Sequence, residues 1–264
     1  MADSLRSLWA YRYFVANSIW NDFYLRFARS RLGGAWLVLQ PLSQVLIYAF
    51  ILSNLLSAKI PGIDNPYGYA IYLMSGLLGW NLFSDIIDRC TKVFVANSNS
   101  IKKVNFPKIA LPVIAIGTAI LNNLVLFIVM TIIFITIGHF PTEKILLIPL
   151  FMLVIVIFAT GIGIILGIIN VFIRDIDQIT PIALQLLFWF TPIVYPISII
   201  PEKYAAFLKL NPLYHVVEFY HQIIAYDTIP SANMVIAITI SGVLLILISF
   251  ILFRRAGADM ADVL

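Results

Sequence analysis

The chain has few charged residues. Asp, Glu, Lys and Arg make up 11% of its 264 residues, whereas hydrophobic residues make up 61%, and the mean hydropathy is +0.98. A soluble core of this size cannot bury that much apolar surface. The composition therefore excludes a soluble globular protein and predicts an all-α integral membrane protein.

Other features that are scarce exclude further classes. The single cysteine, Cys90, rules out an internal disulfide. The sequence has no glycine-rich loop ending in Gly-Lys-Ser or Gly-Lys-Thr to hold a triphosphate, and no stretch between spans is long enough for a nucleotide-binding domain. We therefore predict no catalytic site, no metal site and no bound cofactor in this chain, which is expected not to be an enzyme.

Long apolar runs are what the chain does contain. A membrane-spanning helix needs about 20 apolar residues. Six stretches meet this length, at residues 35–56, 67–87, 110–137, 145–172, 179–200 and 234–253.

The cations indicate the orientation. With a cytoplasmic amino terminus, six spans leave 13 of the 17 Lys and Arg on the cytoplasmic side and place Lys59, Lys144, Lys203 and Lys209 outside. The excess of cations predicts that both termini are cytoplasmic. The net charge of +4 is thus a topology signal, because the basic residues flank spans rather than forming a nucleic-acid surface.

Residues 4–30 alternate apolar and polar positions at mostly three- and four-residue steps, which predicts an amphipathic helix lying in the membrane interface. Residues 1–34 form this interfacial part. They lack the apolar core and cleavage site of a signal peptide, so we expect them to be retained. In span two, Asp85 and Arg89 are one turn apart and are expected to pair.

Two charged connections face the predicted cytoplasm. Residues 91–108 are rich in Asn, Ser and Lys and form either a loop resting on the membrane or a docking surface for a soluble partner. Arg174, Asp175 and Asp177 interrupt the apolar sequence only long enough for a tight turn.

Prolines interrupt span five and the segment after it. Thr191 to Pro196, TPIVYP, cannot continue a regular helix. In a bilayer the freed carbonyls must be buried in protein or face a water-filled cavity. Residues 201–226 are too broken for a span, and they predict two short outer helices, one starting at Pro201 and one capped by Asn211 and opened by Pro212.

Four motifs then carry a family resemblance. The segments LRFARSRLGGAWLVLQPL, FIRDIDQI, TPIVYP and NPLYHVVEFYH, in this order, resemble the permease subunit of ABC-2 type transporters, in the branch that exports O-antigen, capsule or teichoic acid. The resemblance covers nearly the whole chain and implies a single domain, residues 1–264, that forms a homodimer with two copies of a separate ATPase subunit. ATP and Mg would be bound by that partner. The family often has Arg three residues after the Glu of its NP motif, where this chain has His221.

The resemblance and the residues together predict three groups of functional side chains. The residues expected to contact the ATPase are Lys92, Asn97, Lys102, Lys103, Arg174, Asp175 and Asp177. The residues expected to line a sugar path, through aromatic faces and a few polar groups, are Trp36, Gln40, Trp80, Trp189, Phe190 and Tyr195. For each of these aromatic residues the alternative is a role in helix packing or in the aromatic belt of the membrane interface. The outer gate is expected at Pro201, Asn211, Pro212, His215, Glu218 and His221, with Glu218 and a protonated His221 forming an ion pair, or else lying solvated at the interface.

The expected function is export of a lipid-linked polysaccharide, O-antigen foremost, across the cytoplasmic (inner) membrane. Teichoic acid, capsule, drug or lipid export are alternatives within the family. A secondary transporter is disfavoured because the acids cluster at span ends rather than mid-span. A membrane glycosyltransferase is disfavoured because His215, Glu218 and His221 are the sole group resembling a catalytic cluster.

Overall fold

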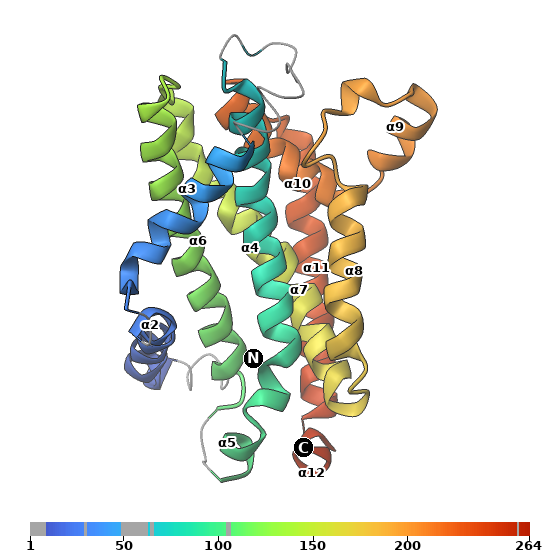
Figure 1. Cartoon of the computed structure of the whole chain (residues 1–264). Helices are drawn as coiled ribbons and strands as arrows, with labels where there is room; N and C mark the ends of the chain where they lie inside the picture. Colours follow the sequence, from blue (N-terminus) through green and yellow to red (C-terminus); the bar gives the residue numbers. More distant parts are fainter. Residues whose placement is uncertain (1–8, 29–30, 49–62, 64–65, 104–106, 258) are drawn as a thin grey trace.

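The computed structural model describes residues 9–28, 31–48, 63, 66–103, 107–257 and 259–264, and every regular element in these ranges is helical. Four long helices stand side by side, and shorter helices lie at both ends (Figure 1). The long helices are α4 (Gly68–Ala96), α6 (Ala110–Thr136), α7 (Ile148–Phe172) and α11 (Ala232–Ala256). The remaining elements are α2 (Arg12–Ala28), η1 (Gly33–Ala35), α3 (Trp36–Tyr48), α5 (Ser98–Lys103), η3 (Glu143–Leu147), α8 (Ile176–Phe190), η4 (Ile197–Ile199), α9 (Glu202–Leu208), α10 (Pro212–Tyr220), the π-turn η5 (His221–Ala225) and α12 (Asp259–Val263).

Four of the six predicted spans are confirmed by length and composition: Gly68–Ala96, Ala110–Thr136, Glu143–Phe172 and Ala232–Ala256. The first predicted span begins with α3, and its residues 49–56 lie outside the described residues. The prediction of one span over 179–200 was wrong in extent. Helix α8 starts earlier, at Ile176, and ends at Phe190. Its 15 residues rise about 22 Å, less than the roughly 30 Å of a hydrocarbon core.

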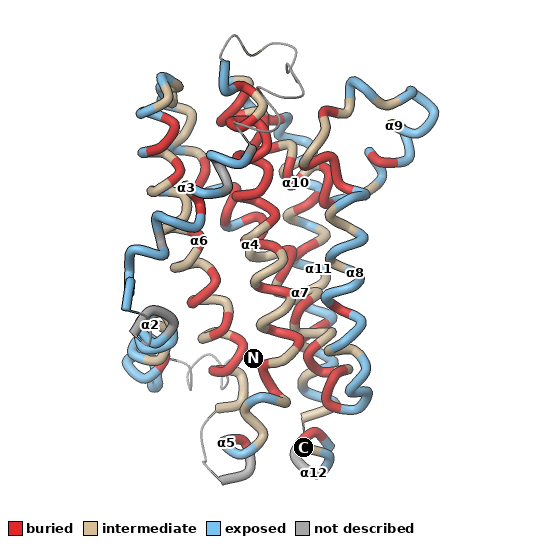
Figure 2. The backbone as a smooth tube through the Cα atoms, viewed as in Figure 1, coloured by how far each residue is buried: buried red, intermediate tan, exposed pale blue. Residues whose placement is uncertain are grey.

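Helix α4 is the centre of the packing. It is buried along most of its length and lies against α6, α7, α8 and α10 (Figure 2). The close approach of α7 depends on Gly167, because a Cβ there would overlap the backbone oxygen of Cys90 on α4. Gly161 is packed in the same way against Leu245 of α11. Gly161 and Gly167 therefore allow α7 to pack closely against α11 and α4.

Helix α2 lies across the bundle, beside the lower part of α6 in Figure 1. Val15 is buried, and Ile19 lies so close to Gly117 of α6 that a Cβ at that glycine would overlap it. Tyr13 and Trp20 are 70% and 60% exposed. A helix with one packed face and exposed amphipathic aromatics fits the predicted position in a membrane interface.

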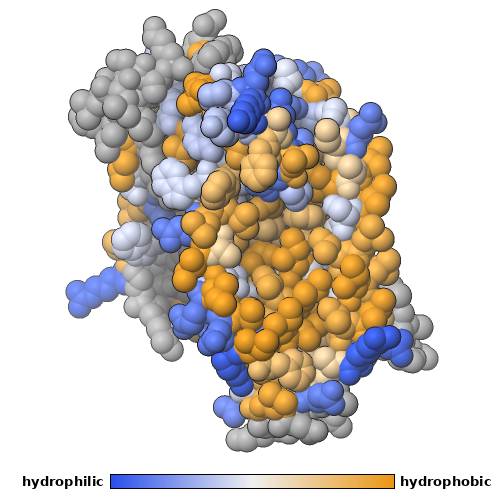
Figure 3. All heavy atoms as spheres, turned by 90° about the vertical axis from the view of Figure 1, so that its right-hand side faces the viewer, coloured by the Kyte–Doolittle hydropathy of each residue, from blue (hydrophilic) through white to orange (hydrophobic). Residues whose placement is uncertain are grey.

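The outer surface carries a broad apolar face over α8 and α11, with polar residues below and above it (Figure 3). On α8 the exposed apolar side chains follow steps of three and four residues: Ile179, Ile182, Leu186 and Trp189. On α11 they include Ile240, Leu244, Leu247 and Ile251. This surface matches contact with lipid or with another apolar protein face.

Candidate functional site

At the lower end of the molecule, the two segments predicted to contact an ATPase lie together. The Asn170 side chain, at the end of α7, donates to the backbone oxygen of Thr91 on α4 (2.9 Å) and accepts from the N–H of Asp177 on α8 (3.2 Å). Lys92 Nζ lies 3.8 Å from the Asp177 carboxylate. Asn170 is buried and therefore holds the turn before α8 against α4. Sequence reasoning missed it, because one Asn near a span end gives no signal of its partners.

The other predicted contact residues surround this junction. Asn97 ends α4, and its side chain donates to the oxygen of Val93 (2.8 Å). Arg174 and Asp175 are exposed in the turn before α8. Lys102 and Lys103 end α5, but their side chains lie outside the described residues, as do residues 104–106 of the same connection.

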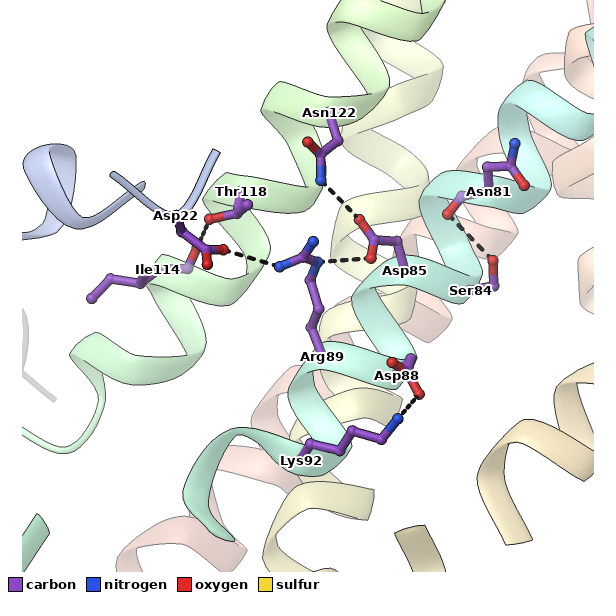
Figure 4. A network of polar contacts seen from close by, with 10 residues as sticks. All are labelled: Asp22, Asn81, Ser84, Asp85, Asp88, Arg89, Lys92, Ile114, Thr118 and Asn122. Atoms are coloured by element: carbon purple, nitrogen blue, oxygen red, sulfur yellow. Dashed lines mark hydrogen bonds and ion pairs between the residues drawn. The ribbon is translucent and has the colours of Figure 1, made fainter. Parts of the chain in front are cut away.

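A second charged group joins three helices just above this junction (Figure 4). Arg89 of α4 donates to Asp85 on the same helix (2.7 Å) and to Asp22 of α2 (3.1 Å). Asn122 of α6 donates to the other oxygen of Asp85 (3.4 Å). The Asp85–Arg89 pair was predicted correctly. Asp22 and Asn122 were not assigned to it, because they are far from it in the sequence.

This group borders an open cleft of about 870 Å³ between α2, α4 and α6. Five charged side chains line it: Asp22, Asp85, Asp88, Arg89 and Lys92. The rest of its wall is mainly apolar, and includes Phe14, Val93, Leu111, Ile114 and Ala115.

At the upper end, the two short helices α9 and α10 lie where the sequence predicted helices. Pro201 precedes α9, and Pro212 opens α10. The Asn211 side chain accepts from the N–H of Leu213 (3.0 Å) and so caps α10 as expected. His215 does not join the predicted cluster, because its Nε2 lies 2.9 Å from the Lys209 oxygen instead.

Glu218 and His221 do lie together, with Oε2 and Nδ1 separated by 3.7 Å. His221 is fully buried, so the alternative of a solvated interface residue was wrong for it. Burial lowers the pKa of His221, and the nearby Glu218 carboxylate opposes that shift. The expected protonated His221 is therefore not the favoured form in this packing, because burial penalises the charged ring.

The His221 ring is held against α4. It stacks on Tyr72 with ring centroids 3.8 Å apart, and a Cβ at Gly76 would overlap its Nε2. Tyr220 packs in the same way on Gly79. Helix α4 thus has glycines at the two positions where Tyr220 and His221 approach it, and these glycines make the close contact possible.

At the break after α8, side chains of the protein form hydrogen bonds with the backbone oxygens. The hydroxyl of Tyr69 donates to the oxygen of Val194, and the hydroxyl of Tyr72 lies 3.4 Å from the oxygens of Pro192 and Tyr195. The Asn211 amide donates to the Thr191 hydroxyl (3.2 Å). Carbonyl oxygens of the irregular segment after α8 therefore point at α4, and α8, α4 and α10 meet at this break.

The predicted path residues divide into two kinds. Trp36, Gln40, Trp189 and Phe190 are exposed, and the hydroxyl of the partly buried Tyr195 donates to the oxygen of Trp189 (2.7 Å). Trp80 is 7% exposed and packs edge-on against Phe188 of α8. Its ring fills the space between α4 and α8, which agrees with the packing alternative for this residue.

The helical bundle, its apolar outer face and its polar ends define a multi-span membrane protein with a charged junction at one end and the short helices α9 and α10 at the other. The family model for the ABC-2 type transporter matches residues 15–225, and the chain belongs to that family. It is thus a membrane permease component, as the four motifs had indicated.

Curated relatives cover almost the whole chain. The chain is 28% identical over 244 residues to the O-antigen export system permease protein RfbA of Klebsiella pneumoniae, with 92% of each protein covered. It is 26% identical over 260 residues to the protein of the same name from Myxococcus xanthus, with 98% of each covered. The polysialic acid transport protein KpsM of Escherichia coli is 29% identical over 197 residues, which cover 73% of this chain and 74% of KpsM.

Proposed function

We propose that this chain is the channel-forming subunit of an ABC exporter that moves a lipid-linked polysaccharide, most closely O-antigen, outward across the cytoplasmic membrane. The observation that carries the proposal is the full-length similarity to O-antigen export permeases within a family whose model matches most of the chain. Capsule export is the second candidate, since KpsM is similar over a shorter stretch.

In this proposal the lower end faces the cytoplasm and both termini are there. Six spans complete the topology, with α3 beginning the first and with α8 and the proline-broken segment after it together forming the fifth. The excess of cations at the lower end supports this orientation, because Lys and Arg concentrate on the cytoplasmic side of bacterial membrane proteins.

Two copies of the chain would enclose the path, and two copies of a separate ATPase subunit would supply the energy. The exposed apolar side chains of Ile179, Ile182 and Leu186 on α8 support the homodimer, because their regular spacing suits contact with a second helical face, and Trp189 at the end of this stripe is left to the path. The junction of Lys92, Asn170 and Asp177 supports coupling between the ATPase and the path. A displacement of either cytoplasmic segment would be transmitted to α4 and α8 together, because the junction connects them.

The sugar chain would slide past Trp36, Gln40, Trp189, Phe190 and Tyr195. Sugars present apolar faces edged with hydroxyls, so exposed aromatic rings with occasional polar groups offer a surface of low specificity. At the upper end α9 and α10 would close the path. The contacts of Tyr69, Tyr72 and Asn211 at the α8 break support a joint movement of gate and path.

The test is purification of the chain from its native host, combined with deletion of its gene. An ATPase subunit is expected to co-purify, and deletion is expected to leave a lipid-linked glycan on the cytoplasmic side, whose sugar composition identifies the substrate. Purification without an ATPase, together with normal surface glycan after deletion, would contradict the proposal.

A further inference from the structure

The cleft between α2, α4 and α6 is not used by the path, the gate or the coupling junction, although Lys92 borders both the cleft and the junction. Its volume of about 870 Å³ falls within the range of roughly 300–1,000 Å³ for small-molecule sites. It also combines charged and apolar walls. A ligand of this cleft must therefore carry both charged and apolar groups.

The position of the cleft on α4 and α2 fits the level of lipid headgroups. Helix α2, which forms one wall, is oriented across the bundle with exposed aromatic side chains, as expected of an interfacial helix (Figure 1). On α4, Arg89 lies 21 residues from Gly68, a rise of about 32 Å along the helix, which is close to the thickness of a hydrocarbon core. A membrane lipid therefore reaches the cleft without leaving its leaflet.

The charges of the cleft select among headgroups. Its lining holds three carboxylates, Asp22, Asp85 and Asp88, and two cations, Arg89 and Lys92, so one formal negative charge remains. Asp22 and Asp88 are 51% and 42% exposed and retain access to a ligand beside their ion pairs. An anionic headgroup would add repulsion, whereas a group carrying both an ammonium and a phosphate meets opposite charges at both ends.

The apolar part of the wall accommodates the rest of a lipid. Phe14 of α2 and Leu111 and Ile114 of α6 line the cleft beside the charges. The acyl chains of a lipid that enters from its own leaflet stay in an apolar environment, so these side chains accommodate them, and any selectivity comes from the headgroup. An open cleft with a charged and an apolar part suits an amphiphile better than a free metabolite.

We propose that this cleft binds an ethanolamine phospholipid of the surrounding leaflet. Its primary ammonium group lies at the exposed edges of the Asp22 and Asp88 carboxylates, beside the ion pairs that they form, and its phosphate lies toward Lys92 and Arg89. The bound headgroup fills the space between α2 and α4. Together with the Asp22–Arg89 ion pair, it holds α2 against α4. This inference does not depend on which substrate the transporter exports.

The test uses the full chain reconstituted, with its co-purifying partner if there is one, in nanodiscs holding equal amounts of phosphatidylethanolamine, phosphatidylcholine, phosphatidylglycerol and a polyprenyl phosphate. Lipids that stay bound after transfer to detergent are counted by native mass spectrometry. We expect ethanolamine lipid to be enriched at least threefold over each of the others. Equal retention of the choline lipid would overturn the primary-ammonium assignment, and preference for phosphatidylglycerol or polyprenyl phosphate would overturn the charge argument.

Variants locate the lipid. Asp22→Asn and Asp88→Asn are each expected to reduce the enrichment at least twofold, whereas Asp259→Asn, the same change at an exposed residue of α12 outside the cleft, should leave it unchanged. Ala96→Phe fills the rim of the cleft from an exposed position and keeps every charge, so it tests the site even if an aspartate variant misfolds. Undiminished enrichment in Ala96→Phe would place the bound lipid elsewhere and overturn the proposal.

Discussion

Arg89 of α4 donates a hydrogen bond of 3.1 Å to the carboxylate of Asp22 on α2, although 67 positions separate the two residues in the chain. Arg89 also donates to Asp85 of its own helix (2.7 Å). One guanidinium therefore connects the interfacial helix to the central helix of the bundle.

The first prediction tests that connection. Partly exposed ion pairs contribute roughly 0.2–1 kcal/mol, so Asp22→Asn should lower the thermal stability slightly. Arg89→Met should lower it more, because it leaves both carboxylates without their cation. A double-mutant cycle measured by thermal unfolding in detergent should give a coupling energy below about 1 kcal/mol. Strictly additive effects would show that the pair does not hold α2.

The second prediction concerns coupling. Arg174 is exposed in the turn that Asn170 anchors against α4. Arg174→Glu should therefore uncouple ATP hydrolysis from export without changing membrane insertion. The measurement compares ATPase activity with surface glycan, and Arg255→Glu, an exposed cation near the end of α11, serves as the matched control. Unchanged export with an unchanged ATPase response would remove this turn from the mechanism.

The third prediction concerns the path. Trp189 is 58% exposed on the apolar stripe of α8. If passing sugars stack on it, Trp189→Ala should slow extrusion several-fold more than Trp189→Phe, because stacking needs a flat ring. Extrusion is measured in cells at matched protein levels. An equal loss in both variants, with less protein in the membrane, would mark Trp189 as a packing residue.

The fourth prediction concerns the gate and pH. Burial lowers the pKa of His221, so its neutral form is favoured in the folded state and its packing contributes fully above its unfolded pKa of about 6.5. As pH falls below that value, protonation favours states in which His221 leaves the pocket formed by Tyr72 and Gly76. The Glu218 carboxylate, which lies 3.7 Å away, stabilises the protonated ring and so limits the shift toward these states.

Leakage of a small dye through the resting transporter is therefore expected to rise between neutral and mildly acidic pH. His221→Gln should remove that dependence, and Glu218→Gln should steepen it by removing the nearby negative charge. His221→Arg should leak at every pH, because a permanent charge would be buried against Gly76. A wild-type protein whose leakage is the same from neutral to mildly acidic pH would contradict the role of His221.

The fifth prediction concerns the loop that follows η5. Asp227 has a left-handed backbone with φ of 50°, accepts a hydrogen bond from Thr142 and lies 3.1 Å from Lys144 Nζ. The Thr142 hydrogen bond and Lys144 hold the pKa of Asp227 below its usual value. The contacts of the ionised Asp227 carboxylate therefore stabilise the fold at neutral pH, and this stabilisation is lost as pH falls through the lowered pKa.

Asp227→Ala should lower the melting temperature more than Asp227→Gly, because alanine retains a left-handed strain of roughly 1 kcal/mol that glycine does not. Asp227→Asn should be the mildest of the three changes, since Asn tolerates this backbone conformation. Equal melting temperatures for the Ala and Gly variants would show that the backbone at Asp227 relaxes.

The sequence by itself determined the class, the helical content and the local breaks. Apolar runs of about 20 residues can be identified without knowing their neighbours, and prolines stop α8 and open α10 through their own geometry. The Asp85–Arg89 pair and the Asn211 cap were predictable for the same reason, because both partners lie within four residues of each other.

Contacts between helices were decided by the tertiary structure alone. The assignments of Asp22 to Arg89, of Asn170 to Thr91 and of Tyr69 to Val194 depend on how helices far apart in the chain lie together. The same holds for the burial of Trp80 and His221, which the sequence presents as an aromatic and a titratable residue of unknown environment. Periodicity defines which face of a helix is apolar, but the neighbour that covers this face is set by packing, which is why path and gate residues required the structure.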